Sequence, residues 1–401
     1  MGLKEAVKDR ILILDGALGT MIQKYGLSET DFRGERFAHL PGQQRGNNDL
    51  LVLSRPEVIR EIHTRYLEAG ADIIETCTFN SQSISLADYH CESLVKEINF
   101  AAAQLARTCA DNYATPEKPR FVAGSVGPTN KTCSLSPDVN DPALRTLHFD
   151  ELAIAYQEQI EALLEGGVDA ILIETVFDTL NAKAAVVAAQ AAMSTKGREV
   201  PIMLSVTVAD KGGRTLSGQT LEAFLASFST MPIFSVGLNC SFGAKDMKPF
   251  LENLAARAPY YISVYPNAGL PNSLGEYDET PEHMASEVAE FLDENLINIV
   301  GGCCGTTDKF IAEYPKLLEG RTPHRPVAVP SCLWLSGLES CEIRPERNFT
   351  NIGERCNVAG SRKFLRLVSE KKYDEAIMDY SKAISLNPNY AIAYKGRGDC
   401  Y

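Results

Sequence analysis

The sequence has no cluster of basic residues. Its 401 residues include 39 lysines and arginines against 52 aspartates and glutamates, which gives a formal net charge of −13 at pH 7. Proteins that bind nucleic acids contact the phosphates with patches of lysine and arginine. The charge balance therefore argues against a nucleic-acid partner.

The sequence also has no long apolar run. No stretch of about eighteen apolar residues occurs, so no membrane-spanning helix is expected. Residues 1–10 are charged and have no apolar centre of the kind found in signal peptides. The 11 cysteines, an odd number, are more typical of reduced thiols and metal binding than of disulfides. These features predict a cytoplasmic protein, and an apolar content of 45% is enough for a large core.

Short apolar runs alternate with helical patterns over the first 320 residues. The predicted strands are 11–14, 72–76, 120–125, 170–174, 201–206, 234–238, 261–264 and 297–300. The predicted helices are 54–68, 93–113, 150–164, 178–193, 220–228, 244–257, 281–294 and 306–320. Residues 21–54 show no clear periodicity and are expected to form a long functional loop.

Eight strands, each followed by a helix, predict an α/β fold with a parallel sheet covered by helices. The best match is a (β/α)8 TIM barrel with a short C-terminal extension that ends in a helical pair. An open doubly wound sheet is the alternative, but no G-x-G-x-x-G motif follows the first strand. In a barrel the active-site residues lie at the carboxyl ends of the strands.

Two cysteine-containing segments stand at such strand ends. Cys240 follows the sixth predicted strand, and the adjacent Cys303 and Cys304, flanked by glycines, follow the eighth. Three thiolates leave one position open on a tetrahedral zinc ion, as in catalytic sites. Free cysteines also pack as small buried residues, but glycines around an adjacent pair favour a metal site.

Histidine is absent from the ends of the predicted strands. None of the six histidines lies at a predicted strand end: His39, His63, His90, His148, His283 and His324. Neutral histidines suit a zinc ion that activates water, whereas thiolates keep a bound sulfur electron-rich. The ligand set therefore favours alkyl transfer to a substrate thiol over hydrolysis.

Acidic and small residues complete the predicted site. Asp15 and Glu174 end the first and fourth strands, and Glu75 ends the second. We expect Asp15 and Glu174 to bind the α-ammonium of an amino-acid thiol, with Gly16 and Ser125 near its carboxylate. The alternative is that the two acids cap a helix or bind a loop.

Six motifs in this order resemble the homocysteine S-methyltransferase family, over about residues 10–325. They are 15–20 (DGALGT), 75–76 (ET), 124–128 (GSVGP), 173–175 (IET), 237–240 (GLNC) and 301–306 (GGCCGT). The resemblance implies zinc on Cys240, Cys303 and Cys304, and carboxylates for the homocysteine amino group at Asp15 and Glu174. It also implies an enzyme that transfers a methyl group to the homocysteine thiolate and gives methionine.

The segment after the barrel bears on the methyl donor. Beyond a proline-rich linker at 323–330, residues 349–364 resemble the start of a pterin-binding barrel, with Asn357 as a pterin contact. This order of modules resembles cobalamin-dependent methionine synthases. It implies methylcobalamin, or a cobalamin-carrying domain, as donor and partner, although no cobalamin-binding module is recognised in this sequence. The alternative is a stand-alone homocysteine methyltransferase with a sulfonium donor such as S-methylmethionine.

The C-terminal tail has a different character. Residues 373–394 resemble a tetratricopeptide repeat, with Pro388 between two helices. A lone repeat cannot bury its apolar face. We assign the tail no function, and a chimeric reading frame and a fusion are both open. An adaptor protein with purely structural zinc is a further alternative.

The predicted domains follow from these assignments. They are 1–325, the homocysteine-binding barrel; 326–364, a linker with the truncated start of a pterin-binding domain; and 365–401, the tetratricopeptide-like tail.

Overall fold

The structure is a computed structural model. It describes residues 2–141, 143–273, 275–347, 350, 362–386, 393–394 and 397. The chain divides into two compact units, Met1–Glu342 and Ile343–Tyr401. All the strand-end residues of the predicted site belong to the first unit.

The first unit is a closed parallel barrel. Its strands are β1 (Leu12–Ile13), β2 (Ile73–Glu75), β3 (Phe121–Val126), β4 (Ala170–Val176), β5 (Ile202–Val206), β6 (Ser235–Asn239), β7 (Tyr261–Tyr265) and β8 (Ile299–Val300). They form one eight-stranded sheet with parallel neighbours. β1 pairs with β8, and a parallel bridge between Leu14 and Ile73 joins β1 to β2. The predicted (β/α)8 barrel is confirmed.

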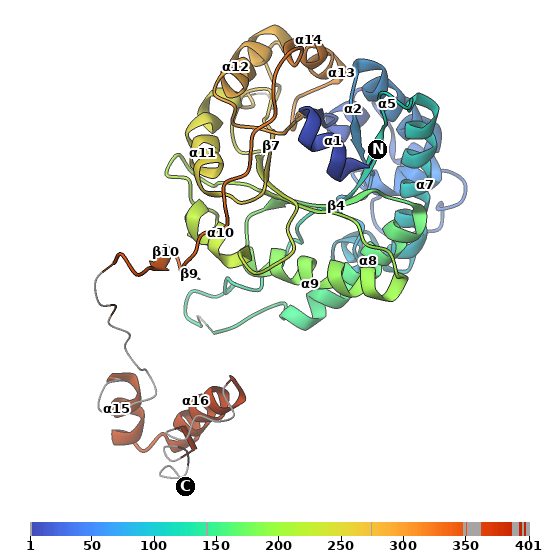
Figure 1. Cartoon of the computed structure of the whole chain (residues 1–401). Helices are drawn as coiled ribbons and strands as arrows, with labels where there is room; N and C mark the ends of the chain where they lie inside the picture. Colours follow the sequence, from blue (N-terminus) through green and yellow to red (C-terminus); the bar gives the residue numbers. More distant parts are fainter. Residues whose placement is uncertain are drawn as a thin grey trace. The chain divides into compact units, whose positions relative to one another are not determined.

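Helices surround this barrel as a ring (Figure 1). The main ones are α5 (Pro56–Ala69), α7 (Val95–Tyr113), α8 (Phe149–Gly166), α9 (Thr179–Lys196), α10 (Leu221–Phe228), α11 (Ala244–Arg257) and α12 (Pro281–Asp293). Between β2 and α7 lie α6 (Ser83–Leu86) and the 3-10 turns η2 (Ala87–Tyr89) and η3 (Glu92–Leu94). The apolar faces of the helices pack against outward-facing strand residues such as Ile74 and Val122, which forms the main core.

The segment 21–54 differs from its predicted form as a long loop. It contains α3 and α4, and α2 overlaps its start. Their bounds, with those of a 3-10 turn η1, are α2 (Leu18–Gln23), α3 (Glu29–Arg33), η1 (Asn48–Leu50) and α4 (Leu51–Ser54). Ser28 and Asp31 form a reciprocal capping box at the start of α3. These helices are too short to give a periodic apolar pattern, so the sequence prediction missed them.

The last helix of the barrel also differs from the prediction. The single helix expected at 306–320 is divided into α13 (Asp308–Ile311) and α14 (Tyr314–Leu317). Pro315 lies in the first turn of α14. Proline has no N–H to continue the hydrogen bonding of the preceding turn, so it starts a new helix instead.

A helix that the sequence analysis did not predict covers the amino-terminal end of the barrel. α1 (Leu3–Asp9) lies across the end that faces the viewer in Figure 1. Its buried residues Leu3, Ala6 and Val7 share a core cluster with barrel-interior residues such as Phe121. One end of the barrel is therefore closed by packing, and the polar strand-end residues lie at the other.

A β-hairpin follows the barrel. It consists of β9 (Leu333–Ser336) and β10 (Ser340–Ile343). The Ser336 hydroxyl donates to the carbonyl oxygen of Ala223 in α10 at 2.7 Å, and the Thr220 N–H donates to the carbonyl oxygen of Leu338 at 3.0 Å. The hairpin therefore packs on the outside of the first unit.

The second unit contains α15 (Arg362–Ser369) and α16 (Tyr373–Leu386). Its small core consists of Leu367, Ala376, Tyr380 and Ala393, and the expected C-terminal helical pair is confirmed, with its turn between residues 369 and 373. Apart from residue 350, the pterin-like segment up to residue 361, with Asn357, lies outside the described residues. The join at Pro388 lies outside them too.

The described helices include none with the length and hydrophobicity that a membrane span requires.

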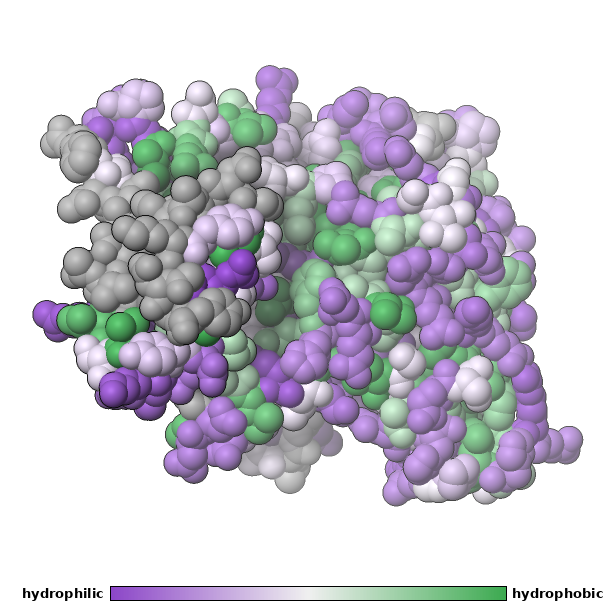
Figure 2. Space-filling model, turned by 90° about the horizontal axis from the view of Figure 1, so that it is seen from below, coloured by the Kyte–Doolittle hydropathy of each residue, from purple (hydrophilic) through white to green (hydrophobic). Residues whose placement is uncertain are grey.

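On the face seen in Figure 2, hydrophilic side chains cover most of the visible surface and hydrophobic ones are scattered among them. Scattered exposed apolar residues are normal on globular proteins.

Candidate metal and substrate site

The three cysteines predicted to bind metal meet at the carboxyl end of the barrel. Their sulfur atoms all lie within 4.8 Å of one another. The sulfurs of Cys240 and Cys304 are 3.9 Å apart, and those of Cys303 and Cys304 are 4.0 Å apart. Sulfur ligands at about 2.3 Å from a tetrahedral zinc ion lie about 3.8 Å from one another, so the spacing fits zinc.

The pKa shifts of these three thiols also fit a site for a cation. Hydrogen bonds from Cys303 and Cys304 hold the pKa of Cys240 down to about 2. The contact with Cys240 raises the pKa of Cys303 well above its ordinary value and raises that of Cys304 as well. The protein groups alone thus favour one thiolate shared by three sulfurs. A divalent cation would be needed to keep all three ionised.

Hydrogen bonds from neighbouring loops fix the position of Cys303. Its N–H donates to the carbonyl oxygen of Pro266 at 2.7 Å, and the Gly302 N–H donates to the carbonyl oxygen of Asp15 at 3.0 Å. Gly305 has a φ of +83°, and a Cβ there would lie 2.4 Å from a tyrosine ring. Glycine is therefore required at this turn. The loop after β8 is held by the loops after β1 and β7.

Three carboxyl groups gather at the same end of the barrel: Asp15, Glu75 and Glu174. Asp15 is 2% exposed and Glu174 5% exposed. Burial raises the pKa of Asp15 and Glu75 well above their ordinary values, and that of Glu174 to about 7. The charge of Glu174 raises the pKa of the other two further. Because burial and mutual repulsion both oppose ionisation, the cluster favours a cationic ligand.

The hydrogen bonds of these carboxyl groups are incomplete. Asp15 Oδ2 accepts from the Glu75 N–H at 3.0 Å, whereas Asp15 Oδ1 is buried without a partner among the described residues. The Ser125 hydroxyl donates to Glu174 Oε1. A buried carboxylate oxygen without a donor is costly unless a ligand supplies one. Asp15 therefore has an acceptor available for a bound molecule.

Gly16 lies in a close-packed part of the site. A Cβ at this position would lie 2.9 Å from the Tyr66 hydroxyl and 3.0 Å from Thr306 Oγ1. A larger residue would push the backbone out of this position. The contact of Gly16 with a substrate carboxylate stays a prediction.

Asn239, which was noted in the sequence only as part of the GLNC motif, has a structural role that the motif did not predict. Its Oδ1 accepts from Thr175 N–H at 3.1 Å and from the Ser205 hydroxyl at 2.6 Å. Its Nδ2 donates to Thr175 Oγ1 at 2.8 Å and lies 3.9 Å from the sulfur of Cys303. Thr175 has a φ of 54°, which is rare for a β-branched residue. Asn239 therefore supports both a strained turn and the thiol cluster.

β7 and the loop after it contribute two polar residues to this end of the barrel that were not predicted from the sequence. Tyr265 is 2% exposed and Asn267 5% exposed, and Tyr265 OH and Asn267 Oδ1 have no partner among the described residues. Burial raises the pKa of Tyr265 well above its ordinary value. The sequence signal that could have identified them is their position, since Tyr265 ends β7 and Asn267 follows two residues later.

A second group of possible metal ligands consists of Glu279, His283 and Glu287. Hydrogen bonding to Glu279 raises the pKa of His283, so the imidazolium forms ion pairs with the two glutamates. This ion-pair arrangement at the start of α12 needs no metal.

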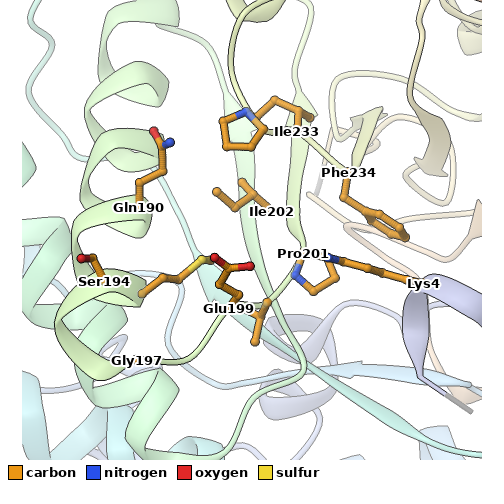
Figure 3. A pocket seen from close by; sticks show the side chains of 12 residues that line it. Lys4, Gln190, Ser194, Gly197, Glu199, Pro201, Ile202, Ile233 and Phe234 are labelled. Carbon is orange, nitrogen blue, oxygen red and sulfur yellow. The ribbon is translucent and has the colours of Figure 1, made fainter.

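A cavity of about 910 Å³ lies near the amino-terminal end of the barrel. In Figure 3, Lys4 enters it from α1, and Gln190 and Ser194 line it from α9. Catalytic groups of TIM barrels lie at the opposite end. None of the thiols or carboxyl groups described above lines this cavity.

Comparison with known proteins gives two family matches. A sequence model described as homocysteine S-methyltransferase matches residues 12–318, and one described as TPR repeat matches residues 365–401. The first match includes Asp15, Glu174 and all three clustered cysteines. The second agrees with the resemblance predicted for the tail.

Among solved structures, the chain is similar to the homocysteine methyltransferase MmuM from Escherichia coli. The oxidized form is 23% identical, with a TM-score of 0.59, and the match covers 76% of this chain and 95% of that chain. The metallated form is 24% identical, with a TM-score of 0.57, and the match covers 76% of this chain and 96% of that chain. At this level of identity the likeness shows a shared fold.

Proposed function

The chain belongs to the homocysteine S-methyltransferase family, and we propose that its barrel binds zinc and homocysteine and methylates the homocysteine sulfur to give methionine. One observation carries this proposal: three clustered thiols and the two buried carboxyl groups of Asp15 and Glu174 share the carboxyl-terminal end of one barrel. The thiols suit a metal that binds a sulfur, and the carboxyl groups suit an ammonium. Homocysteine carries both groups.

Cys240, Cys303 and Cys304 would hold the metal. Bound zinc would supply one chemical effect, which is to keep the substrate sulfur in its nucleophilic thiolate form at neutral pH. The protein would contribute to this chemistry by placing the three sulfurs at the ends of β6 and β8. Asn239 adds a polar contact, since its Nδ2 lies 3.9 Å from the Cys303 sulfur.

Asp15 and Glu174 would bind the α-ammonium. The unpartnered Oδ1 of Asp15 supports this role, because it lacks the donor that an ammonium would provide. The hydrogen bond from Ser125 favours the ionised form of Glu174 and fixes one of its oxygens. Ser125, which was expected near the substrate carboxylate, would instead act on the substrate through Glu174, while the backbone at Gly16 would lie near the substrate carboxylate.

For the methyl donor we propose methylcobalamin or a cobalamin-carrying domain, as in cobalamin-dependent methionine synthases. The support is the pterin-like sequence at 349–364, which follows the barrel in the order found in those enzymes. The second candidate is a sulfonium donor such as S-methylmethionine. The similarity of the fold to MmuM is compatible with either donor.

The proposed domains keep the division stated from the sequence: 1–325, 326–364 and 365–401. The barrel would carry the homocysteine half of the reaction. Thiol ligands need reducing surroundings, which the cytoplasm provides.

The test uses the purified full chain loaded with zinc. X-ray absorption should show three sulfur ligands without homocysteine and a fourth, at the usual distance of about 2.3 Å, with it. Cys304→Ala should lose the metal, and Cys341→Ala, at an exposed thiol outside the cluster, should keep it. Equal zinc content in the two variants would refute the assignment, and a fixed sulfur count would support a structural zinc in an adaptor protein.

Activity then separates the donors. Methyl transfer from added methylcobalamin without transfer from S-methylmethionine supports the first proposal, and the reverse supports the second. Inactivity with both donors, together with homocysteine binding, would point to a donor carried by another protein domain.

A further inference from the structure

Glu75 lies in the barrel mouth without a role in the proposed chemistry. We propose that Glu75 is a specificity-determining residue that contacts the substrate ammonium as a third acceptor beside Asp15 and Glu174. The site would then select thiols with a primary amine over N-alkylated or amine-free thiols. This inference rests on the proposed function.

The direction of β2 places Glu75 inside the barrel. Side chains along a strand alternate between its two faces. Ile73 belongs to the barrel-interior cluster and Ile74 to the outer core, so Glu75 returns to the interior. Its N–H donates to Asp15 Oδ2 at 3.0 Å, which fixes the strand end beside Asp15.

The carboxyl group of Glu75 lacks the partners that a structural acid normally has. It accepts no hydrogen bond from the residues that the structure describes. Burial and the charges of Glu174 and Asp15 account for its raised pKa, and no cationic side chain contributes to it. Glu75 is half-buried, and its carboxyl group has neither a donor nor a counter-ion among the described residues, so no structural role accounts for its charge.

The number of N–H donors on a primary ammonium equals the number of carboxyl groups at this end of the barrel. The ammonium has three N–H donors, and β1, β2 and β4 each bring one carboxyl group to the mouth. Asp15 offers its unpartnered Oδ1, and Glu174 has one oxygen occupied by Ser125. With Glu75 as the third acceptor, every donor of the ammonium has a charged partner. A secondary ammonium has one N–H fewer and would leave one carboxyl group without a donor.

The experiment measures binding by calorimetry, with no methyl donor present. Zinc-loaded full chain is titrated with homocysteine, N-methylhomocysteine and 4-mercaptobutyrate, which has the same thiol chain without the amine. We expect the parent protein to bind N-methylhomocysteine about tenfold more weakly than homocysteine, and 4-mercaptobutyrate more weakly still, as expected from lost charge-assisted hydrogen bonds.

The variant Glu75→Gln keeps the shape of the side chain and removes its charge. It should bind homocysteine about tenfold more weakly and 4-mercaptobutyrate within about twofold of the parent, because the latter has no ammonium to lose. The control is Glu252→Gln, at an exposed glutamate of α11. It should bind all three ligands like the parent. Zinc content and melting temperature are measured for each protein.

The outcomes separate the two proposals. If the parent binds no homocysteine, the proposed function fails. If the parent binds it and Glu75→Gln discriminates among the three ligands as the parent does, or weakens all of them equally, the inference about Glu75 is overturned. Should the variant fail to fold, the parent alone decides: equal affinity for homocysteine and N-methylhomocysteine overturns the inference.

Discussion

Replacing Glu174 with glutamine should remove a pH dependence from homocysteine binding. Glu174 is 5% exposed, and burial raises its pKa to about 7. A carboxyl group with this pKa is ionised in about nine molecules out of ten at pH 8 and in about one out of ten at pH 6. Only the ionised form attracts the ammonium. The parent should therefore lose about tenfold in affinity over this range through Glu174, whereas glutamine does not titrate.

The size of the effect at pH 8 follows from the lost charge. A hydrogen bond to a charged group contributes about 1.5–3 kcal/mol, so Glu174→Gln should weaken binding by about 10- to 150-fold. Deprotonation of the substrate thiol also depends on pH, but it does so in both proteins. The ratio of the two dissociation constants therefore reports the loss of Glu174, together with the lower pKa of Asp15 and Glu75 once its charge is gone. Calorimetry on zinc-loaded protein between pH 6 and pH 8 should show this ratio falling by about tenfold towards pH 6.

Ser125→Ala provides a matched test of the cause. The Ser125 hydroxyl stabilises the ionised form of Glu174 and so lowers its pKa. Without it the pKa should rise, and the loss of affinity should begin at a higher pH than in the parent. A ratio for Glu174→Gln that stays constant from pH 6 to pH 8 would refute the reasoning.

Three further predictions concern stability and the extension. Removal of zinc by a chelator should leave the far-ultraviolet circular dichroism unchanged, because the apolar core packs without the thiols; a collapse of the spectrum would contradict this. Asn239→Ala should lower the free energy of unfolding by about 1–3 kcal/mol in denaturant titrations, since it leaves buried donors unpaired; wild-type stability would argue against the network. Deletion of residues 344–401 should leave the melting temperature of the barrel unchanged, whereas deletion of 330–401 also removes the hairpin on α10 and should lower it by a few degrees.

The alternation of strands and helices made the barrel predictable. Runs such as 170–173 are apolar along their whole length, which is typical of strands buried on both faces. The positions of Cys240 and Asp15 followed, because strand ends in such a barrel converge. The capped short helix in the 21–54 segment and the helix break at Pro315 each depend on one or two residues. Hydrophobic periodicity is measured over several turns, so it does not reveal them.

The contacts within the site were harder to predict. Glu75 was recognised at a strand end, but that position alone gives neither the missing hydrogen bonds of its carboxyl group nor its proximity to Asp15 and Glu174. These depend on the stagger of adjacent strands in the closed ring. The role of Asn239 depends likewise on the left-handed backbone at Thr175, which a threonine in a sequence does not reveal.

The seam of the barrel, where the first strand β1 pairs with the last strand β8, has a consequence for folding. β1 and β8 are each two residues long, and the loops that follow them are joined by bonds such as Gly302 N–H to the Asp15 carbonyl. Contacts between the two ends of a long chain carry a large loop-closure entropy and tend to form late. Because Gly302 is hydrogen-bonded across this seam, Cys303 would reach its final position once the seam is closed. Metal capture would therefore coincide with the final step of ring closure, and the rate at which a thiol reagent modifies Cys303 in metal-free protein would report how often the ring opens.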